Sequence, residues 1–329
     1  MPNGKTTIAA GAAATAMGDR MTDSRPMLLT GATGVLGRWL RPHLAERYGA
    51  LRCSDIVDPA PAGRGEELRI VDLADAEAVD RLVAGTRRII HFGGISFETS
   101  FERINAANIL GTYNVFEAAR RHNAGPIVYA SSNHATGFYS RDDHLDGRAT
   151  PRPDSLYGVS KAFGENLASL YADKWGLDIA CLRIGTAAPA PTDPRHLSTW
   201  QSYPDLLRLI EACFAATKLN FTVLYGVSAN ARSWWSNAHA PHVAYVPKDS
   251  AESAAAEMFK HGDRRDFQDP AVKFQGGPFV ADGYRRRSGR RRHPLNRGSG
   301  MPVTPGRRAN RLPAWGWSER SPVGRIEVR

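Results

Sequence analysis

The chain has 329 residues, which is enough for one large α/β domain with a small appendage, and a formal net charge of +10. Residues 285–329 alone hold 13 Arg, no Lys and two Glu, a net charge of +11. Taking +11 from +10 leaves −1 for residues 1–284, so the sequence predicts no nucleic-acid partner for this main part. No apolar run is long enough to predict a membrane span.

The two ends of the chain differ in composition from its middle. Residues 1–24 are rich in Ala and Gly and only weakly hydrophobic, so we expect a disordered or misassigned extension rather than a secretory signal. Residues 285–329 are rich in Arg, Gly and Pro without any hydrophobic period, so we expect a disordered tail. Its composition is typical of sequence translated out of frame; an arm that binds nucleic acid or an anionic surface is the alternative.

From Pro26 onward, short apolar segments alternate with amphipathic ones. Strands are predicted at 27–30, 51–55, 68–72, 88–92, 126–131 and 177–183, and helices at 35–48, 75–83, 101–122 and 156–175. This alternation predicts an α/β fold with a Rossmann-like, doubly wound parallel sheet within residues 25–284. After Ile184 the rhythm loosens, with a helix at 199–217, a strand at 221–225 and a helix at 249–261. Residues 185–284 are therefore expected to form most of a small C-terminal substrate cap.

Three cysteines, Cys53, Cys181 and Cys213, indicate a reducing environment. Their number is odd, and two of them fall in apolar runs, so we expect buried free thiols rather than a disulfide framework. The sequence therefore predicts a cytoplasmic protein. It predicts no metal site.

A glycine-rich loop, Gly31-Ala-Thr-Gly34-Val35-Leu36-Gly37, follows the first predicted strand and opens the first helix. Glycines at these positions allow a tight turn, close approach of a pyrophosphate and packing of helix on strand. The N-terminus of a helix also favours negative charge. A structural turn is the alternative for three glycines alone, but the place of the loop between strand and helix favours a dinucleotide. Gly31, Gly34, Val35, Leu36 and Gly37 are the candidate phosphate-binding residues.

Three further segments fit the rest of such a cofactor. Asp55 ends the second strand, 18 residues after Gly37, where a carboxylate accepts hydrogen bonds from the adenosine ribose. A carboxylate there repels a 2′-phosphate, so NAD is favoured over NADP; a strand-end Asp with a structural role only is the alternative. Asp72 and Leu73 are expected to flank the adenine, and Gly93 to leave space for the cofactor.

A tyrosine and a lysine lie at i and i+4 in Tyr157-Gly-Val-Ser-Lys161, on one face of a predicted helix. A tyrosine pKa is ordinarily ~10, and a nearby ammonium is expected to lower it by roughly 1–3 units, which makes the tyrosine a usable base. Ser132, at the end of the strand 126–131, is placed to hold a substrate hydroxyl beside Tyr157. An amphipathic helix with a half-buried Tyr and an exposed Lys is the alternative.

These motifs together resemble the extended short-chain dehydrogenase/reductase superfamily between Pro26 and Ile184. Within it, the chain is similar to the uronate dehydrogenases from Pro26 to Val280. The segments that carry this resemblance are His91-Phe-Gly-Gly-Ile-Ser96, Ala130-Ser-Ser-Asn-His134, Tyr157-Gly-Val-Ser-Lys-Ala-Phe-Gly-Glu-Asn166, Leu182-Arg-Ile-Gly185, Arg195-His-Leu-Ser-Thr-Trp200, Gly226-Val-Ser-Ala-Asn230 and Phe274-Gln-Gly-Gly277. The resemblance implies NAD-dependent oxidation of D-galacturonate or D-glucuronate at C1 to an aldaro-lactone.

The resemblance also implies roles for individual residues. Tyr157 would take the proton of the anomeric hydroxyl, Lys161 would lower the tyrosine pKa and bind the nicotinamide ribose, and Ser132 would orient the C1 oxygen. The positions that line the substrate site are Ser96, Ser132, Asn133, His134, Thr186 and Arg195, of which Thr186 stands where many relatives have serine. Arg195 suits the carboxylate of a sugar acid because a guanidinium pairs bidentately with it; a solvated loop arginine is the alternative.

Two other functions remain open from the sequence. A nucleotide-sugar epimerase or dehydratase shares the same motifs but needs a larger C-terminal lobe than the residues after Ile184 provide. A non-catalytic NAD-sensing regulator is disfavoured because Ser132, Tyr157 and Lys161 occur together. The helices 101–122 and 156–175 commonly pair across a two-fold axis in this superfamily, so a homo-oligomer, either a dimer or a larger assembly, is expected.

Overall fold

The computed structural model describes residues 24–263 and 265–285. The expected N-terminal extension and C-terminal tail therefore lie, except for their innermost residues, outside the described part. The described residues up to Tyr284 belong to one compact unit.

A seven-stranded parallel sheet forms the centre of this unit. Its strands are β1 (Met27–Thr30), β2 (Leu51–Asp55), β3 (Glu66–Ile70), β4 (Arg88–His91), β5 (Ile127–Ser132), β6 (Ile179–Ile184) and β9 (Phe221–Gly226). They lie in the order β3-β2-β1-β4-β5-β6-β9, and each neighbouring pair is parallel. Central strands such as β1 and β4 are buried along their whole length, as expected when helices cover both faces of a parallel sheet. The predicted fold class is confirmed.

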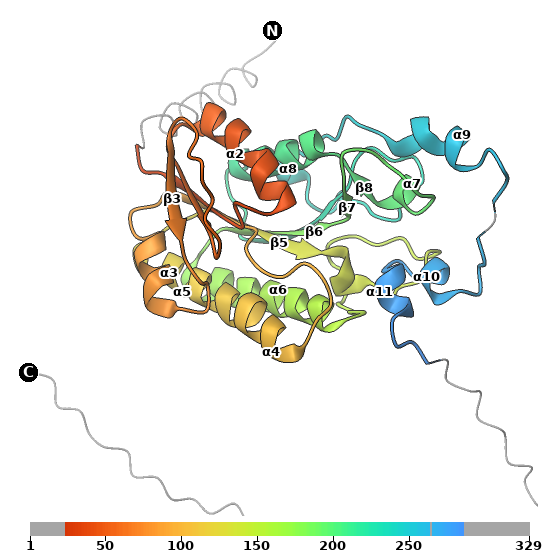
Figure 1. The fold of residues 1–329 in the computed structure, drawn as a ribbon, viewed down its shortest axis with the longest axis horizontal. Helices are drawn as coiled ribbons and strands as arrows, with labels where there is room; N and C mark the ends of the chain where they lie inside the picture. Colours follow the sequence, from red (N-terminus) through yellow and green to blue (C-terminus); the bar gives the residue numbers. More distant parts are fainter. Residues whose placement is uncertain (1–23, 264, 286–329) are drawn as a thin grey trace, which may run out of the picture. The chain divides into compact units, whose positions relative to one another are not determined.

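Helices cover both faces of the sheet (Figure 1). On one face lie α2 (Val35–Tyr48) and α8 (Tyr203–Ala215); on the other lie α3 (Ala76–Val83), α4 (Phe101–Ile104), α5 (Gly111–His122) and α6 (Leu156–Trp175). Because side chains alternate along a strand, Leu29 packs with Leu40 of α2, whereas Leu28 packs with Val115 of α5. Each fully buried Leu or Val of this kind stabilises the fold by roughly 1.5–3 kcal/mol.

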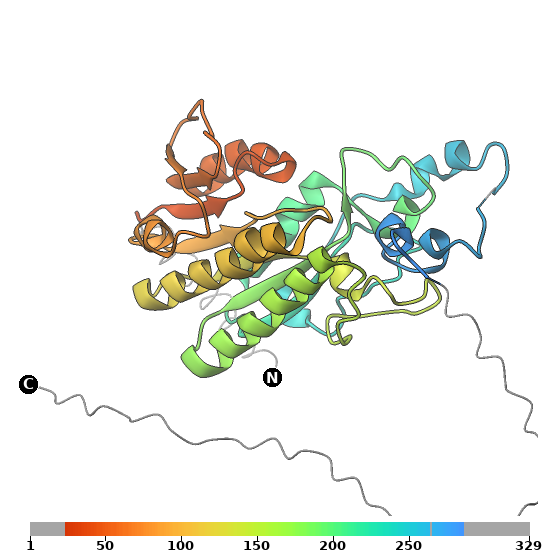
Figure 2. The same cartoon turned by 60° about the horizontal axis from the view of Figure 1, so that its bottom comes forward.

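The predicted long helix over 101–122 is present but is widened in its middle. Between α4 and α5 the chain forms a π-helical segment, η1 (Asn105–Leu110). Within it, Asn108 donates from Nδ2 to the Ile95 carbonyl at 2.9 Å and to Ser160 Oγ at 3.0 Å, and its Oδ1 accepts from the Ile95 N–H at 2.8 Å. The wide turn therefore ties the loop after β4 to α6. Figure 2 shows α5 and α6 side by side.

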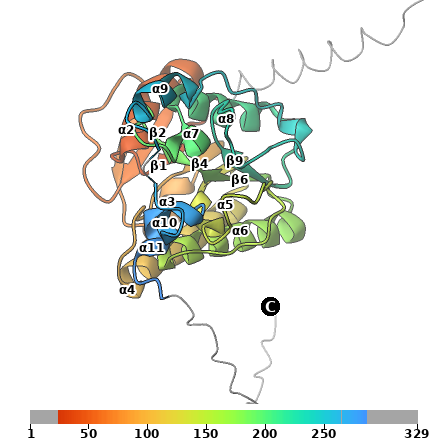
Figure 3. The same cartoon turned by 90° about the vertical axis from the view of Figure 1, so that its right-hand side faces the viewer.

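The expected cap range, 185–284, divides between the main fold and the cap. The segment forming α8 and β9 completes the sheet and its helical layer, since β9 pairs with β6. The cap lies at the carboxyl ends of the strands (Figure 3). It comprises β7 (Thr186–Ala187), α7 (His196–Thr199), β8 (Trp200–Gln201), η4 (Ala251–Ala254), α9 (Ala255–Met258), α10 (Pro270–Lys273) and α11 (Pro278–Ala281). The helix predicted over 249–261 is wrong in extent, because only η4 and α9 form there.

Two short 3-10 turns, η2 (Asn133–Thr136) and η3 (Pro241–Val243), complete the described elements. None of the helices in the described residues combines the length and the apolar character that crossing a bilayer requires.

Candidate active site

A cavity of about 660 Å³ lies at the carboxyl ends of β1, β4, β5 and β6. The strand order reverses between β1 and β4, and open parallel sheets bind ligands at such a point. Most of the candidate residues line this cavity: Gly31, Gly34, Val35, Leu36, Gly37, Asp55, Ser96, Ser132, Asn133, His134, Tyr157, Lys161, Thr186 and Arg195. The other three, Asp72, Leu73 and Gly93, line a second cavity of about 340 Å³ that shares wall residues with the first.

The glycine loop leaves the N-terminus of α2 open to the cavity. Gly31 has φ +76°, and a Cβ there would lie 2.6 Å from the Phe92 carbonyl carbon. A Cβ on Gly37 would lie 2.1 Å from the Gly31 oxygen, so the turn cannot close with side chains at these positions. Gly34 precedes α2 without a capping side chain, and the first turn of α2 carries no acidic residue. The free N–H groups and the helix dipole are therefore available to phosphate oxygens.

Asp55 serves the glycine loop as well as facing the cavity. Its Oδ2 accepts hydrogen bonds from the backbone N–H of Thr33 at 2.9 Å and from Thr33 Oγ1 at 2.7 Å. Its Oδ1 accepts from the Ile56 N–H at 2.7 Å. A carboxylate oxygen can accept more than one hydrogen bond. Asp55 can therefore still accept one from a ribose hydroxyl while it is bonded to Thr33 and Ile56. The open helix end, this carboxylate and the second cavity beside it fit the pyrophosphate, ribose and adenine of NAD.

Ser132 and Tyr157 are brought together by the end of β5 and the start of α6. The hydroxyl of Ser155 accepts from the Gly158 N–H at 2.9 Å and caps α6. The Glu98 carboxylate accepts from the N–H of Leu156 at 3.0 Å and from that of Tyr157 at 2.9 Å. The loop after β4 therefore fixes the first turn of α6, on which the catalytic tyrosine candidate stands.

The electrostatics of the tyrosine differ from the expectation. Burial raises the Tyr157 pKa to about 12, a hydrogen bond with Ser132 lowers it, and the charge of Asp154 raises it. Burial also lowers the Lys161 pKa to about 8. The Lys161 ammonium lies over the tyrosine ring, 5.5 Å from its centroid. The prediction that the protein alone lowers the tyrosine pKa is therefore wrong, because desolvation outweighs the favourable contacts. The alternative of an exposed lysine is also wrong, since Lys161 is buried.

Arg195 reaches the cavity from the cap. Its Nε and Nη2 donate to the Gln275 carbonyl at 3.1 and 2.6 Å, and its Nη1 donates to Thr186 Oγ1 at 2.9 Å. With the Asn133 amide turned so that its nitrogen donates to the Ile184 carbonyl, its oxygen accepts from Nη2 at 3.0 Å. Four of the five guanidinium N–H groups are thereby used, which leaves one on Nη1 rather than the pair that bidentate binding needs.

The charge of Arg195 is not neutralised by a direct partner. Burial lowers its pKa to about 10, against weak opposing effects from Asp193 and Asp154. Among the described residues, no carboxylate forms an ion pair with this guanidinium. A buried cation that contacts only neutral groups is costly, and an anionic ligand in the cavity would relieve that cost. The alternative of a solvated loop arginine does not fit, because the guanidinium is hydrogen-bonded to Gln275 and Thr186.

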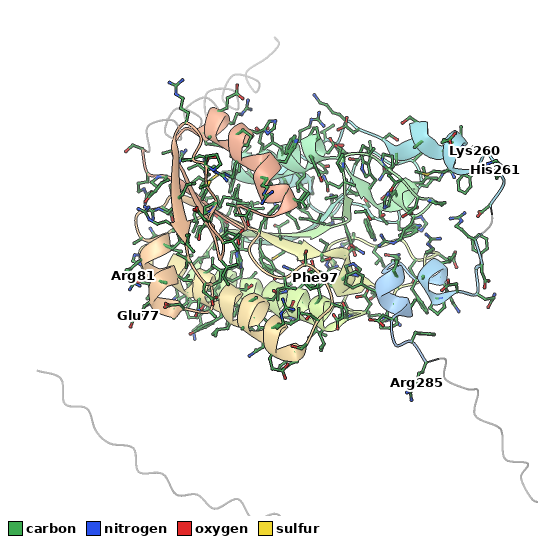
Figure 4. All side chains as sticks on the ribbon, viewed as in Figure 1. Glu77, Arg81, Phe97, Lys260, His261 and Arg285 are labelled. Carbon is green, nitrogen blue, oxygen red and sulfur yellow. The ribbon has the colours of Figure 1, made fainter. Side chains whose placement is uncertain are left out.

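His134 and Ser96 complete the predicted substrate residues. The His134 ring stacks on Phe279 of α11 with centroids 3.9 Å apart, and its Nδ1 lies 2.8 Å from Asp154 Oδ2. Ser96 lines the cavity from the loop between β4 and α4, next to Phe97, which is 51% exposed (Figure 4).

Several residues around the cavity were not predicted from the sequence. Glu98, Asp154, Gln275 and Phe279 come from loops or the cap, where no local pattern marks a function. The buried Gln275 side chain donates to two loop carbonyls and accepts from Trp235 Nε1 at 2.7 Å. It thereby holds the segment that carries Phe279 against the cavity. The run Phe274-Gln-Gly-Gly277, one of the segments that carry the family resemblance, is the signal in the sequence that points to this wall.

Comparison with known proteins agrees with this geometry. Residues 27–201 match the NAD dependent epimerase/dehydratase family. The uronate dehydrogenase of Pseudomonas syringae pv. tomato is 46% identical, over 78% of this chain and 94% of that protein. The crystal structure of glucuronic acid dehydrogenase from Chromohalobacter salexigens is 47% identical with a TM-score of 0.76, over 78% of this chain and 97% of that one. A variant of the uronate dehydrogenase from Agrobacterium tumefaciens, complexed with NAD, is 47% identical with a TM-score of 0.75, over the same shares of the two chains. The chain belongs to the NAD dependent epimerase/dehydratase family and, within it, to the family of the uronate dehydrogenases.

Proposed function

We propose that the protein oxidises a hexuronate, D-galacturonate or D-glucuronate, at C1 and passes the hydride to NAD. The C1 hydride leaves for the cofactor, the anomeric hydroxyl loses its proton, and the C1–O bond becomes the carbonyl of an aldaro-lactone. The observation that carries the choice of a sugar acid is the partly buried Arg195 guanidinium, which lines the same cavity as Tyr157 and has no carboxylate partner among the described residues. Family membership supports the same reaction.

Tyr157 is the proton acceptor in this proposal. Its pKa of about 12 means that the phenolate needs positive charge nearby to form. NAD would supply the hydride acceptor and the positive charge of its nicotinamide ring, and Lys161 supplies an ammonium 5.5 Å from the centroid of the tyrosine ring. Ser132, which is hydrogen-bonded to Tyr157, holds the C1 oxygen in line with the phenolic oxygen. A base positioned in this way contributes roughly 10²–10⁴-fold to the rate.

Arg195 binds the substrate carboxylate in this proposal. It supplies one N–H on Nη1 and a positive charge inside the cavity. Charge-assisted hydrogen bonds of this kind are about twice as strong as neutral ones. Asn133, His134 and Ser96 are left for the sugar hydroxyls.

The substrate class is tested by supplying NAD with matched sugars and following the absorbance of NADH. D-Galacturonate and D-glucuronate should be oxidised. D-Galactose and D-glucose, which differ in carrying a hydroxymethyl group instead of the carboxylate, should react at least 10²-fold more slowly in kcat/KM. A nucleotide-sugar that is converted while both uronates are inert would contradict the proposal.

Exposed apolar residues on one layer of helices support a homo-oligomer, either a dimer or a larger assembly. Side chains of α4, η1, α5 and α6 expose large apolar groups: Phe101, Leu110, Tyr113, Val159 and Leu170. These helices pack side by side (Figure 2). Groups of large exposed apolar side chains are typical of interfaces between subunits. Buried free thiols at Cys53, Cys181 and Cys213 support the cytoplasm as the compartment.

A further inference from the structure

The ring of His134 is fixed in orientation by two aromatic neighbours. It stacks on Phe279 at a centroid distance of 3.9 Å and an interplanar angle of 29°. It meets the Tyr157 ring edge to face, at 5.7 Å and 63°. With the ring held in this way, Nδ1 points to Asp154, and His134 is one of the residues that line the cavity.

The Asp154 carboxylate that meets the ring is fully enclosed. Its side chain is 0% exposed, its Oδ2 lies 2.8 Å from His134 Nδ1, and its Oδ1 accepts from Ser155 Oγ at 2.8 Å. Two glycines from separate segments close over it. A Cβ on Gly137 would lie 1.8 Å from Oδ2, and a Cβ on Gly276 would lie 1.9 Å from the same atom. Both segments can reach the carboxylate only because neither residue has a side chain.

This contact decides which nitrogen of a neutral His134 ring carries the proton. An ionised carboxylate only accepts hydrogen bonds, so Nδ1 must be the donor. In the neutral imidazole the other nitrogen, Nε2, is then an acceptor. Within the described residues, Nε2 of His134 makes no hydrogen bond. Nε2 therefore has a free lone pair, on a residue that lines the substrate cavity and whose ring contacts that of Tyr157.

We propose that Asp154 is a positioning residue that holds His134 in its Nδ1–H tautomer, so that Nε2 accepts a hydrogen bond from a hydroxyl of the sugar acid. The inference rests on the proposed function and adds a specificity rule to it. The substrate must offer an O–H at the place that Nε2 faces. A sugar that lacks this hydroxyl leaves a buried acceptor unpaired, which sites of this kind reject strongly.

The substitution Asp154→Asn tests the rule because it changes polarity and not shape. Ser155 continues to donate to the side-chain oxygen, so the new amide nitrogen faces Nδ1 and donates to it. The proton of the ring then moves to Nε2, which becomes a donor. The KM for the uronate should rise about 10-fold or more, since a lost hydrogen bond of ~1.4 kcal/mol is a factor of 10. The KM for NAD should stay unchanged. Asp146→Asn, in the same loop but outside the cavity, is the matched control and should behave like wild type.

A double-mutant cycle separates positioning from a general structural role. In a His134→Ala background, Asp154→Asn should change the uronate KM no further, because its effect passes through the imidazole. Equal effects in both backgrounds, or an equal rise in the KM for NAD, would overturn the proposal.

Ring nitrogen NMR on protein labelled with ¹⁵N-histidine gives a readout that needs no activity. The signals that disappear in His134→Ala identify the ring, which should be Nδ1–H in wild type and Nε2–H in Asp154→Asn. An Nε2–H ring in wild type would overturn the proposal. Wild type that is inactive on both uronates would refute the proposed function and with it the substrate part of this inference. An active wild type together with an unchanged KM in Asp154→Asn would refute the inference alone.

Discussion

At Arg195 a partly buried positive charge lies among a hydroxyl, an amide and a backbone carbonyl. Replacing it by methionine keeps the apolar stem but removes the charge and the free N–H. We expect kcat/KM for the uronate to fall roughly 10- to 100-fold, the size of one hydrogen bond to a charged group. The loss should lie mainly in KM, because the carboxylate is bound in the ground state as well as in the transition state.

Initial-rate measurements with galacturonate and NAD check this expectation for Arg195→Met. The matched control is Arg148→Met, because the Arg148 side chain is 77% exposed and pairs only with Asp146 in its own loop. An unchanged KM for the uronate in Arg195→Met would show that the carboxylate is bound elsewhere.

Some residues of the site can be predicted from the sequence and others cannot. The glycine loop, Asp55, Ser132 and the Tyr157/Lys161 pair have fixed spacings relative to strands and helices, and all of them line the two cavities. Asp154 has no such spacing: it matters only because a loop folds back onto His134. The sequence predicts a lowered Tyr157 pKa, whereas burial raises it. The spacing of Tyr157 and Lys161 does not show how deeply the tyrosine is buried.

Helix α6 is anchored to β6 by a buried ion pair one turn beyond Lys161. The Arg183 guanidinium donates to both Glu165 oxygens, at 2.9 and 2.8 Å, and Ser131 donates to the same carboxylate at 2.6 Å. Both charged side chains are almost completely buried. Removing only the carboxylate, in Glu165→Ala, leaves an unpaired buried guanidinium. The free energy of unfolding should fall by roughly 3–5 kcal/mol.

Urea unfolding of Glu165→Ala measures this loss. Glu252→Ala is the control, because the Arg232–Glu252 pair is 48% and 43% exposed and should contribute less than about 1 kcal/mol. Equal small losses in both variants would mean that the buried pair does not hold α6 in place.

His91 makes the junction of β1, β4 and α5 sensitive to acid. Its ring is fully buried between Thr30 Oγ1 at 2.8 Å and Thr112 Oγ1 at 3.3 Å. Burial, together with the charge of Lys161, lowers its pKa to about 3. The unfolded chain takes up the proton near pH 6.5, so this contribution is complete above that pH. It is lost as pH falls, by about 1.4 kcal/mol per pH unit down to about pH 3.

The acid dependence is checked by comparing the unfolding free energies of wild type and His91→Gln between pH 7 and pH 5. The difference between the two proteins should shrink as pH falls, because the variant has no such proton to gain. His144→Gln, at an exposed position, should follow the wild-type curve. Parallel curves for wild type and His91→Gln would contradict a buried neutral histidine.

Elements of the fold were predictable where the chain is regular. The first six strands and their helices follow from the alternation of short apolar and amphipathic segments. β9 was predicted as a strand, but its place beside β6 was not, because it follows a long irregular segment. The π-helical turn at Asn105–Leu110 has no periodic signature and depends on the Asn108 contacts to Ile95 and Ser160.

At the scale of the whole molecule, the exposed apolar face of α5 and α6 predicts self-association. Leu170 of α6 is 48% exposed on this face. The native mass should be at least twice that of the chain, and Leu170→Glu should shift it toward the monomer, because a buried unpaired charge disrupts an apolar interface. Val246→Glu, at a 68% exposed position away from this face, should leave the mass unchanged. Light scattering coupled to gel filtration gives both masses; a monomeric wild type would contradict the prediction.

The proposed reaction depends on Tyr157 acting as the base that takes the proton of the anomeric hydroxyl of a sugar acid. Tyr157→Phe keeps the ring contacts with His134 and Phe279 and removes only the hydroxyl. The most direct measurement is the initial rate of NADH formation from NAD and either uronate, for wild type and for this variant. If Tyr157 is the base, wild type forms NADH rapidly, and Tyr157→Phe has a kcat lower by roughly 10²–10⁴-fold with NAD binding unchanged. No NADH from either uronate with wild type, or equal rates for the two proteins, would contradict it.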